Sequence, residues 1–169
     1  AMAKEVEDNS NITVHKSTTI KRTKGQPGEF DVTLKNGSDP KEIRVGAIIQ
    51  ATGWRQYPTK KLDYLGYGKS PNIVTNIEME EMAKSGKIEL PTGGEPKSVA
   101  FIQCAGSRDK DHIPYCSAVC CRTSLKQAKY LREQYPDCRI YIIYKDIRSP
   151  QQYELFYMQA QEDDGIFLT

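Results

Sequence analysis

Four of the five cysteines lie within eighteen positions of one another, and their spacing indicates metal or redox chemistry. Eleven residues separate Cys104 from Cys116, and three more separate Cys116 from the adjacent pair Cys120 and Cys121. Four thiolates are the ligand number of a cubane iron–sulfur cluster. A disulfide framework fits less well, because such scaffolds usually spread an even number of cysteines along a short secreted chain.

Three other interpretations of these cysteines stay open at this point. A structural zinc site also takes four thiolates, but usually from pairs two to four residues apart, and the adjacent Cys120 and Cys121 fit that spacing less well. The others are a redox-active thiol pair without metal and a set of thiols without a role. Cys138, alone on an apolar stretch, is expected in the core. His112 in the cysteine loop is interpreted as a solvated side chain.

The elements predicted around the cysteines are a strand, a loop and a helix. Residues Ser98–Gln103 (SVAFIQ) predict a buried strand, and apolar residues recurring every three or four positions predict a helix from Ser117 to Tyr135. Cys104 then lies at the carboxyl end of a strand, where α/β sheets bind ligands. Cys116 and Cys120 lie near the start of the helix, whose free N–H groups favour an anionic ligand.

The rest of the C-terminal half predicts a second and a third strand. Residues Cys138–Tyr144 (CRIYIIY) form an apolar strand pattern, and Ile166–Leu168 begin another. Between them, Ser149 as N-cap and Pro150 at the first position predict a helix to about Asp164. The result is a Rossmann-like β-α-β-α-β unit with right-handed, parallel connections.

The N-terminal half predicts a small antiparallel β-meander. Its three strands are expected at residues 11–16, 29–34 and 41–51. The third contains the apolar run Val45–Ile49, typical of a strand buried on both faces, and continues to Ala51, Thr52 and Gly53.

Four segments are expected along the chain. Residues 1–3 are interpreted as a remnant of an expression tag, and the chain as a piece of a longer protein. The β-meander and its Ala-Thr-Gly end occupy 4–70, a linker with a short helix at 77–84 occupies 71–96, and the β-α-β unit occupies 97–169. The Pro- and Gly-rich stretch Pro91–Pro96 is the candidate boundary.

Composition excludes several classes of protein. The 169 residues are 38% hydrophobic and 27% charged, and the net charge is only +2, so no nucleic-acid partner is expected. The longest apolar runs are about five residues, whereas a membrane span needs about 20.

The order of these parts resembles the two-dinucleotide-fold flavoproteins of the thioredoxin reductase type. In that group a β-meander leads to an Ala-Thr-Gly strand end beside the flavin, and a linker leads into a nucleotide-type domain. Here Ile48–Gly53 (IIQATG), the linker and Ser98–Gln103 follow in the same order. The fingerprint G-x-G-x-x-G is not found and would lie upstream of residue 1. Cysteines stand where the second domain of that group has its glycine-rich loop, so no NAD(P) is expected there.

The cysteine segment identifies the family more closely. Phe101–Asp109 (FIQCAGSRD) followed by Pro114–Cys121 (PYCSAVCC) is similar to the A subunit of heterodisulfide reductase. It is equally similar to the related flavoprotein subunits of the quinone-interacting oxidoreductase complex of sulfate reducers and sulfur bacteria. This resemblance implies FAD and a [4Fe-4S] cluster. Carried over position by position, the cluster ligands are Cys104, Cys116, Cys120 and Cys121.

The resemblance further implies an oxidoreductase subunit that passes electrons between FAD and one-electron carriers, together with other subunits of a redox complex. Its expected place is the cytoplasm, either free or peripheral to a membrane-bound complex. Ala51, Thr52 and Gly53 would supply only a wall near the flavin, so this chain alone is expected to bind FAD weakly or not at all and to be inactive.

Three alternative functions remain. One is a zinc-stabilised interaction module without a redox role. Another is a fragment of a pyridine-nucleotide-disulfide oxidoreductase, which requires a dinucleotide fingerprint. The last is a redox-complex subunit whose cluster is only structural.

Overall fold

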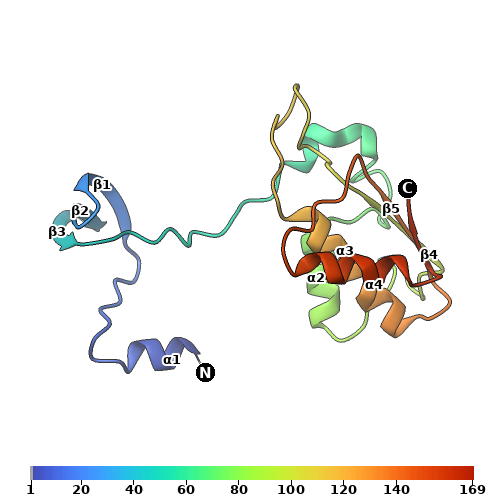
Figure 1. The fold of residues 1–169 in the computed structure, drawn as a ribbon, viewed down its shortest axis with the longest axis horizontal. Coiled ribbons are helices and arrows are strands. Elements are labelled where there is room, and N and C mark those ends of the chain that lie inside the picture. Colours follow the sequence, from blue (N-terminus) through green and yellow to red (C-terminus); the bar gives the residue numbers. More distant parts are fainter. Residues whose placement is uncertain (1) are drawn as a thin grey trace. The chain divides into compact units, whose positions relative to one another are not determined.

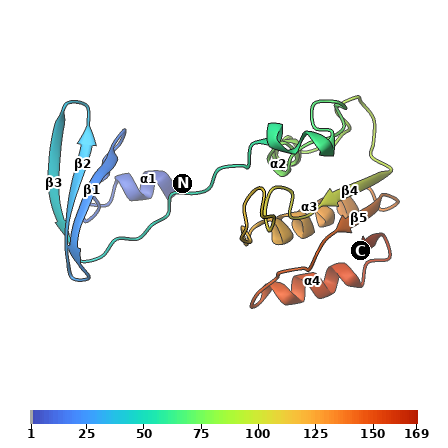
Figure 2. The ribbon, with the colours of Figure 1, turned by 90° about the horizontal axis from the view of Figure 1, so that it is seen from above.

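The computed structural model describes residues 2–169, which divide into two compact units (Figure 1 and Figure 2). The N-terminal unit ends at Arg55 and contains an antiparallel sheet. The C-terminal unit runs from Gln56 to Thr169 and contains a parallel sheet with helices. The predicted α/β class is confirmed. All four clustered cysteines belong to the C-terminal unit, and residues 51–53 belong to the N-terminal one.

The N-terminal unit is a helix followed by a three-stranded meander. Its elements are α1 (Met2–Glu7), β1 (Thr19–Gln26), β2 (Glu29–Asn36) and β3 (Asp39–Val45), and the sheet order is β1-β2-β3. The predicted alternation in β2 is confirmed, because Val32 and Leu34 are buried on one face. Gly25 must be glycine, since its φ is +100° and a Cβ there would collide with the Glu29 carbonyl oxygen.

Two strand predictions in this unit are wrong. The first strand is β1 and not residues 11–16, because the short turn after Gln26 aligns β2 with residues 19–26 and leaves 11–16 beyond its end. The third strand ends at Val45, opposite Phe30 near the start of β2. Residues 46–51 therefore find no strand partner in the described chain, and Ile49 is 91% exposed.

The C-terminal unit is built on three strands that are parallel, as predicted, and their order in the sheet is β4-β5-β6. Its elements are the 3-10 helix η1 (Thr59–Leu65), α2 (Asn76–Lys84), β4 (Ser98–Ile102), α3 (Cys120–Gln134), β5 (Arg139–Ile143), α4 (Tyr153–Gln161) and β6 (Ile166–Leu168). Helix α3 contacts both α2 and α4. Within residues 2–169, no helix combines the length and apolar character that crossing a membrane requires.

The core lies between α3 and one face of this sheet. Leu125, Ala128 and Leu131 of α3 are 0–1% exposed, as are Ile140 and Ile142 of β5. Cys138 is 2% exposed and belongs to the same core, as predicted. These apolar contacts fix α3 against the strands and so fix where its first residues lie relative to the end of β4.

Residues before β4 belong to the same unit. Met79 of α2 and Ile88 lie in the core, and the residues expected as a linker, 71–96, with the candidate boundary at 91–96, fall inside the C-terminal unit. The N-cap of α2 is Thr75. Its hydroxyl accepts a hydrogen bond from the Glu78 N–H, and the Glu78 carboxylate accepts one from the Thr75 N–H.

Two helices begin later than the sequence predicts. Helix α3 starts at Cys120 and not at Ser117, because Ala118 has a φ of +57°, which a right-handed helix excludes. Helix α4 starts at Tyr153 and not after Ser149, because Gln151 has a φ of +61°. The three residues before Cys120 therefore form a bend between Cys116 and the helix.

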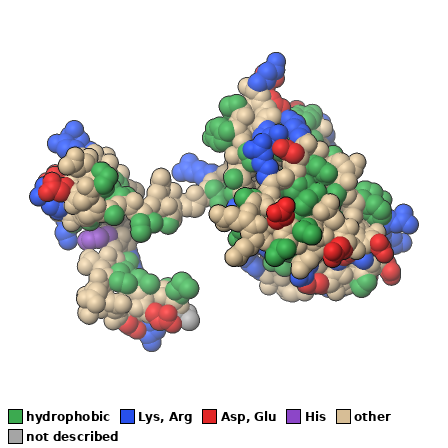
Figure 3. Space-filling model, in the orientation of Figure 1, with side chains coloured by type: hydrophobic (Ala, Val, Ile, Leu, Met, Phe, Trp, Pro, Cys, Tyr) green, Lys and Arg blue, Asp and Glu red, His purple; other side chains and the backbone are tan. Residues whose placement is uncertain are grey.

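Charge is mixed on the surface of the C-terminal unit. On the face drawn in Figure 3, basic and acidic side chains occur among hydrophobic ones. This agrees with the small net charge of +2.

Candidate iron–sulfur site

Cys104 lies where the chain leaves the carboxyl end of the sheet. The Gln103 N–H donates to the Ile143 carbonyl at 2.9 Å, which extends the ladder between β4 and β5 by one residue. Cys104 then takes a left-handed backbone conformation, with a φ of +56°. Its carbonyl accepts a hydrogen bond from the Ser107 N–H at 3.1 Å. The chain therefore turns sharply at the first cysteine.

The loop that follows folds back on itself. The Ile113 N–H donates to the Gly106 carbonyl at 3.3 Å, and the Arg108 N–H donates to the Tyr115 carbonyl at 3.1 Å. Residues 113–115 therefore run beside residues 106–108. This arrangement returns the chain to Cys116 after eleven residues.

Tyr57 packs against this loop and requires a glycine in it. A Cβ on Gly106 would lie 2.5 Å from the Tyr57 ring, and the φ of Gly106 is +79°. The Tyr57 hydroxyl lies 2.8 Å from Nδ1 of His112, with which it shares a hydrogen bond. The prediction of a freely solvated His112 is therefore wrong, because this ring is half-buried and partnered.

Charged contacts attach the loop to the segment after β5. The Arg108 guanidinium forms an ion pair with the Asp146 carboxylate, which Arg148 also approaches at 3.5 Å. Lys145 donates from Nζ to the Arg108 carbonyl at 3.0 Å. The loop after β4 and the loop after β5 are thus joined at one edge of the sheet.

Cys120 and Cys121 lie next to each other at the start of α3 and shift each other's pKa in opposite directions. The Cys120 sulfur accepts hydrogen bonds from the Cys121 S–H, from the Ser117 hydroxyl and from the backbone N–H of Cys104. Donation by Cys121, the largest cause, together with these other bonds lowers the pKa of Cys120 to about 5. Donation to Cys120, followed by burial, raises the pKa of Cys121. Cys120 is therefore the thiolate of the pair.

Two other backbone N–H groups are directed at cysteine sulfurs. The Ala118 N–H lies 3.3 Å from the Cys116 sulfur. The Arg148 N–H, from the loop after β5, is a hydrogen-bond donor to the Cys121 sulfur. Donors of this kind stabilise thiolate ligands and tune the centre that they hold.

The structure brings together the elements that carry the predicted ligands, without assembling the four thiols into one group. The backbone N–H of Cys104, where β4 ends, lies beside the Cys120 sulfur, where α3 begins. Cys116 is half-exposed on the preceding bend. Across residues 2–169, no three or more His, Cys, Asp or Glu side chains form a group that could already hold a metal ion. Metal binding often completes such sites, because thiolates must be deprotonated and drawn together by the metal.

The predicted flavin residues lie in an exposed segment. Ala51, Thr52 and Gly53 follow β3 in the N-terminal unit, outside any helix or strand, and all three are exposed. The strand that was expected to present them to a flavin ends at Val45.

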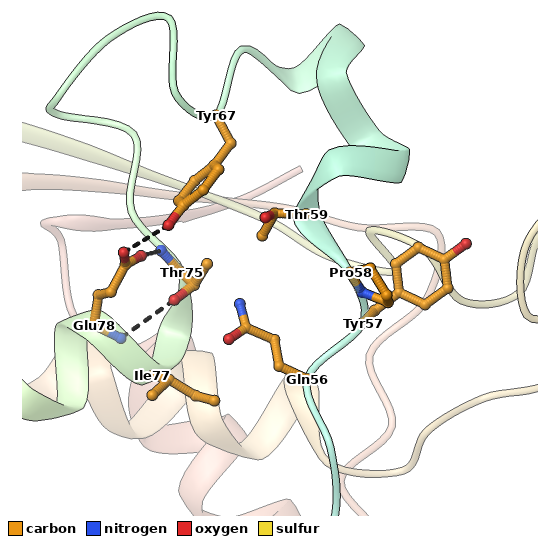
Figure 4. Close-up of a pocket in the computed structure, with 8 residues that line it drawn as sticks. All are labelled: Gln56, Tyr57, Pro58, Thr59, Tyr67, Thr75, Ile77 and Glu78. Atoms are coloured by element: carbon orange, nitrogen blue, oxygen red, sulfur yellow. Dashed lines mark hydrogen bonds between the residues drawn. The ribbon is translucent and has the colours of Figure 1, made fainter.

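A shallow pocket of about 250 Å³ lies elsewhere in the C-terminal unit (Figure 4). Its polar side chains are largely engaged with one another, since Tyr67 donates to the Glu78 carboxylate at 2.7 Å and Thr75 and Glu78 cap α2. None of the described residues that line it is a cysteine. This pocket therefore contains none of the candidate ligands, although Tyr57 belongs both to its lining and to the support of the cysteine loop.

The sequence does not predict the side chains that support the cysteine loop. Tyr57, Arg108 and Lys145 hold the loop, and Gln103 lies buried at its base. Only Gln103 left a signal in the sequence, as a polar residue at the end of the apolar run SVAFI.

The geometry defines an α/β segment with cysteines at the carboxyl edge of a parallel sheet. Comparison with known proteins gives its family. Over 144 residues, 79% of this chain, it is 44% identical to the A subunit of the "H(2):CoB-CoM heterodisulfide,ferredoxin reductase" of Methanothermobacter thermautotrophicus, covering 22% of that protein. Over 134 residues, 74% of this chain, it is 43% identical to an iron-sulfur A subunit, numbered 2, of the "CoB--CoM heterodisulfide reductase" of Methanopyrus kandleri, covering 20% of that protein.

A third relative gives the same result. The chain is 43% identical over 129 residues, 72% of its length, to the A subunit of the "Ferredoxin/F(420)H(2)-dependent CoB-CoM heterodisulfide reductase" of Methanosarcina acetivorans, covering 16% of it. No protein-family model matches the chain. The chain belongs to the family of the heterodisulfide reductase A subunit, and it spans about one fifth of the length of these curated relatives.

Proposed function

We propose that this chain carries the cluster-binding segment of an electron-transfer subunit, with Cys104, Cys116, Cys120 and Cys121 as ligands of one [4Fe-4S] cluster. The observation that carries the proposal is the position of the Cys104 backbone N–H, at the end of β4, beside the Cys120 sulfur at the start of α3. A strand end and a helix start that both carry cysteines and adjoin each other support a site of soft sulfur donors, which iron–sulfur clusters require.

The surroundings of the cysteines fit such a group. Backbone N–H groups of Cys104, Ala118 and Arg148 are directed at cysteine sulfurs. A cluster held by four thiolates is anionic, and these donors, together with the start of α3, favour negative charge. Cys104, Cys116 and Cys120 are partly accessible, which leaves a path for iron and sulfide to enter.

The protein's own task is to hold this set of ligands in place. When bound, the cluster moves one electron at a time. The Arg108–Asp146 ion pair and the Tyr57–His112 hydrogen bond anchor the loop that carries the ligands. The core of α3 fixes Cys120 and Cys121.

The second part of the proposal concerns the flavin and the partners. Residues 51–53 would form one wall of a flavin site, and FAD bound there would supply two-electron chemistry beside the one-electron chemistry of the cluster. Other subunits of a redox complex would be the partners. In support, relatives are named as subunits of heterodisulfide reductases. Residues 51–53 are exposed here, so this chain alone binds FAD weakly or not at all.

Anaerobic reconstitution with iron and sulfide tests the cluster. The unmodified chain should take up about four irons. Changing Cys104, Cys116, Cys120 or Cys121 to Ser should lower the iron content or make the cluster oxygen-labile. Cys138→Ala is the matched control, because Cys138 is a core residue at 2% exposure, and it should keep its iron. Stoichiometric zinc without iron in the unmodified chain contradicts the proposal.

A further inference from the structure

Gln103 is a buried polar residue whose amide is not satisfied. Its side chain is 7% exposed, and its Nε2 atom has no hydrogen-bond partner within residues 2–169. Buried amides are almost always partnered, because leaving an N–H group without an acceptor loses the hydrogen bond that water would make. The Gln103 amide, next in sequence to the candidate ligand Cys104, therefore needs a hydrogen-bond acceptor that the described residues do not provide.

Gln103 lies at the end of β4, and its side chain is on the face of the sheet that α3 covers. Gln103 continues the ladder of β4, and successive side chains of a strand alternate between faces. Its side chain therefore lies on the same face as that of Phe101, which belongs to the core cluster that also contains Leu125 of α3. Helix α3 begins at Cys120, whose sulfur accepts the N–H of Cys104, the residue after Gln103.

Other donors at this edge of the sheet already reach cysteine sulfurs. The Cys104 N–H is directed at Cys120, and the Arg148 N–H is directed at Cys121. The Ser149 hydroxyl, next along the loop after β5, is buried without a partner among the described residues. Gln103 Nε2 and the Ser149 hydroxyl are thus two donors that lack an acceptor among the described residues, and sulfur atoms of a bound cluster would supply acceptors.

We propose that Gln103 is a positioning residue that donates a hydrogen bond from Nε2 to a sulfur of the bound cluster and raises its reduction potential. This inference rests on the proposed function. Reduction adds one electron and one negative charge to the cluster, and a hydrogen bond to sulfur stabilises that charge. Removing the donor therefore makes reduction less favourable without removing a ligand.

The test is a redox titration of the full chain, reconstituted anaerobically and reduced with dithionite, with the reduced cluster followed by electron paramagnetic resonance. Gln103→Leu should keep the iron content of the unmodified chain. The equilibrium constant for reduction of its cluster should fall about tenfold, which lowers the reduction potential by about 59 mV for a one-electron couple. Gln103→Met, which keeps an unbranched side chain without the donor, should do the same and decides the matter if Gln103→Leu does not fold.

Gln127→Leu is the matched control. Gln127 of α3 is also a buried amide, but its Nε2 donates to the Asn76 carbonyl and to the Glu80 carboxylate, both at 2.8 Å. This variant should lower the Tm and leave the potential unchanged. Gln103→Leu and Gln103→Met proteins with full iron and an unchanged potential would overturn the inference and leave the proposed function standing. An unmodified chain without iron would overturn both.

Discussion

At the scale of single residues, the site depends on backbone conformations that few side chains adopt. Cys104, Arg108 and Ala118 all have φ values between +54° and +57°, and Gly106 has a φ of +79°. Such conformations cost free energy and persist where the surroundings hold them in place. Here the surroundings are the Tyr57 ring and the ion pair between Arg108 and Asp146.

Gly106→Ala should destabilise the C-terminal unit more than alanine does at the other glycines of that unit that have a positive φ. The Cβ would meet the Tyr57 ring at 2.5 Å, so the expected loss in free energy of unfolding is roughly 2–4 kcal/mol. Gly94→Ala is the control, because Gly94 has a φ of +89° and open space around it, and it should lose only about 1 kcal/mol. Urea unfolding measures both, and equal losses would contradict the contact with Tyr57.

Asp163 should make stability fall in acid. Burial raises its pKa, but hydrogen bonds from Arg132 and the Gly165 N–H outweigh burial, so the pKa is held below its ordinary value of 3.8. A carboxylate with a lowered pKa contributes stability above its unfolded-state pKa and loses it as pH falls through the folded-state value. Asp163→Asn should therefore flatten the decline of unfolding free energy below about pH 3.8. An unchanged acid slope in urea titrations would contradict this role.

At the scale of elements, the sequence predicted the strands and helices that bury one face. It did not predict the helix starts that are set by left-handed backbone conformations. The strands β4, β5 and β6 and the apolar stripe of α3 were predicted because alternation and three-to-four spacing survive into the structure. The starts of α3 and α4 were predicted too early, because left-handed Ala118 and Gln151 carry no signal in residue type. Strand β1 was not predicted, because all of its residues are exposed and it shows no alternation of buried and exposed positions. Its place is set by pairing with β2.

The capping box of α2 should be measurable on its own. Thr75→Ala removes the hydroxyl that accepts the Glu78 N–H, and the free energy of unfolding should fall by about 1 kcal/mol. Thr75→Ser keeps the acceptor and should keep most of the stability. Thermal unfolding of the two variants compares them, and an equal loss in both would show that the methyl group and not the cap matters.

At the scale of the whole molecule, the sequence predicted the α/β class and the cysteine segment but not the exposed state of residues 46–55. An apolar strand needs neighbours, and β3 has one only as far as Val45. The family, in turn, could be predicted from FIQCAGSRD and PYCSAVCC. The supporting contacts of Tyr57 and Lys145 could not, because these residues are far from the cysteines in sequence.

The two units should be separable by limited proteolysis. Arg55 is exposed between β3 and η1, in a segment without helix or strand. Trypsin should therefore release a fragment beginning at Gln56, identifiable by mass spectrometry, that binds as much iron as the full chain. Arg55→Gln should slow that cleavage. A fragment that takes up no iron, while the full chain does, would contradict a site contained in the C-terminal unit.

Iron-edge X-ray absorption of the anaerobically reconstituted chain is the sharpest test of a four-cysteine cluster, because it reports the atoms bound to iron. We expect iron surrounded by sulfur alone, with neighbouring irons at the short distance of a cluster. The Cys120→Ser and Cys121→Ser proteins should lose this signature, and Cys138→Ala should retain it. Iron bound by nitrogen or oxygen, or an unchanged sulfur-only spectrum in both serine variants, would contradict a cluster held by these four cysteines.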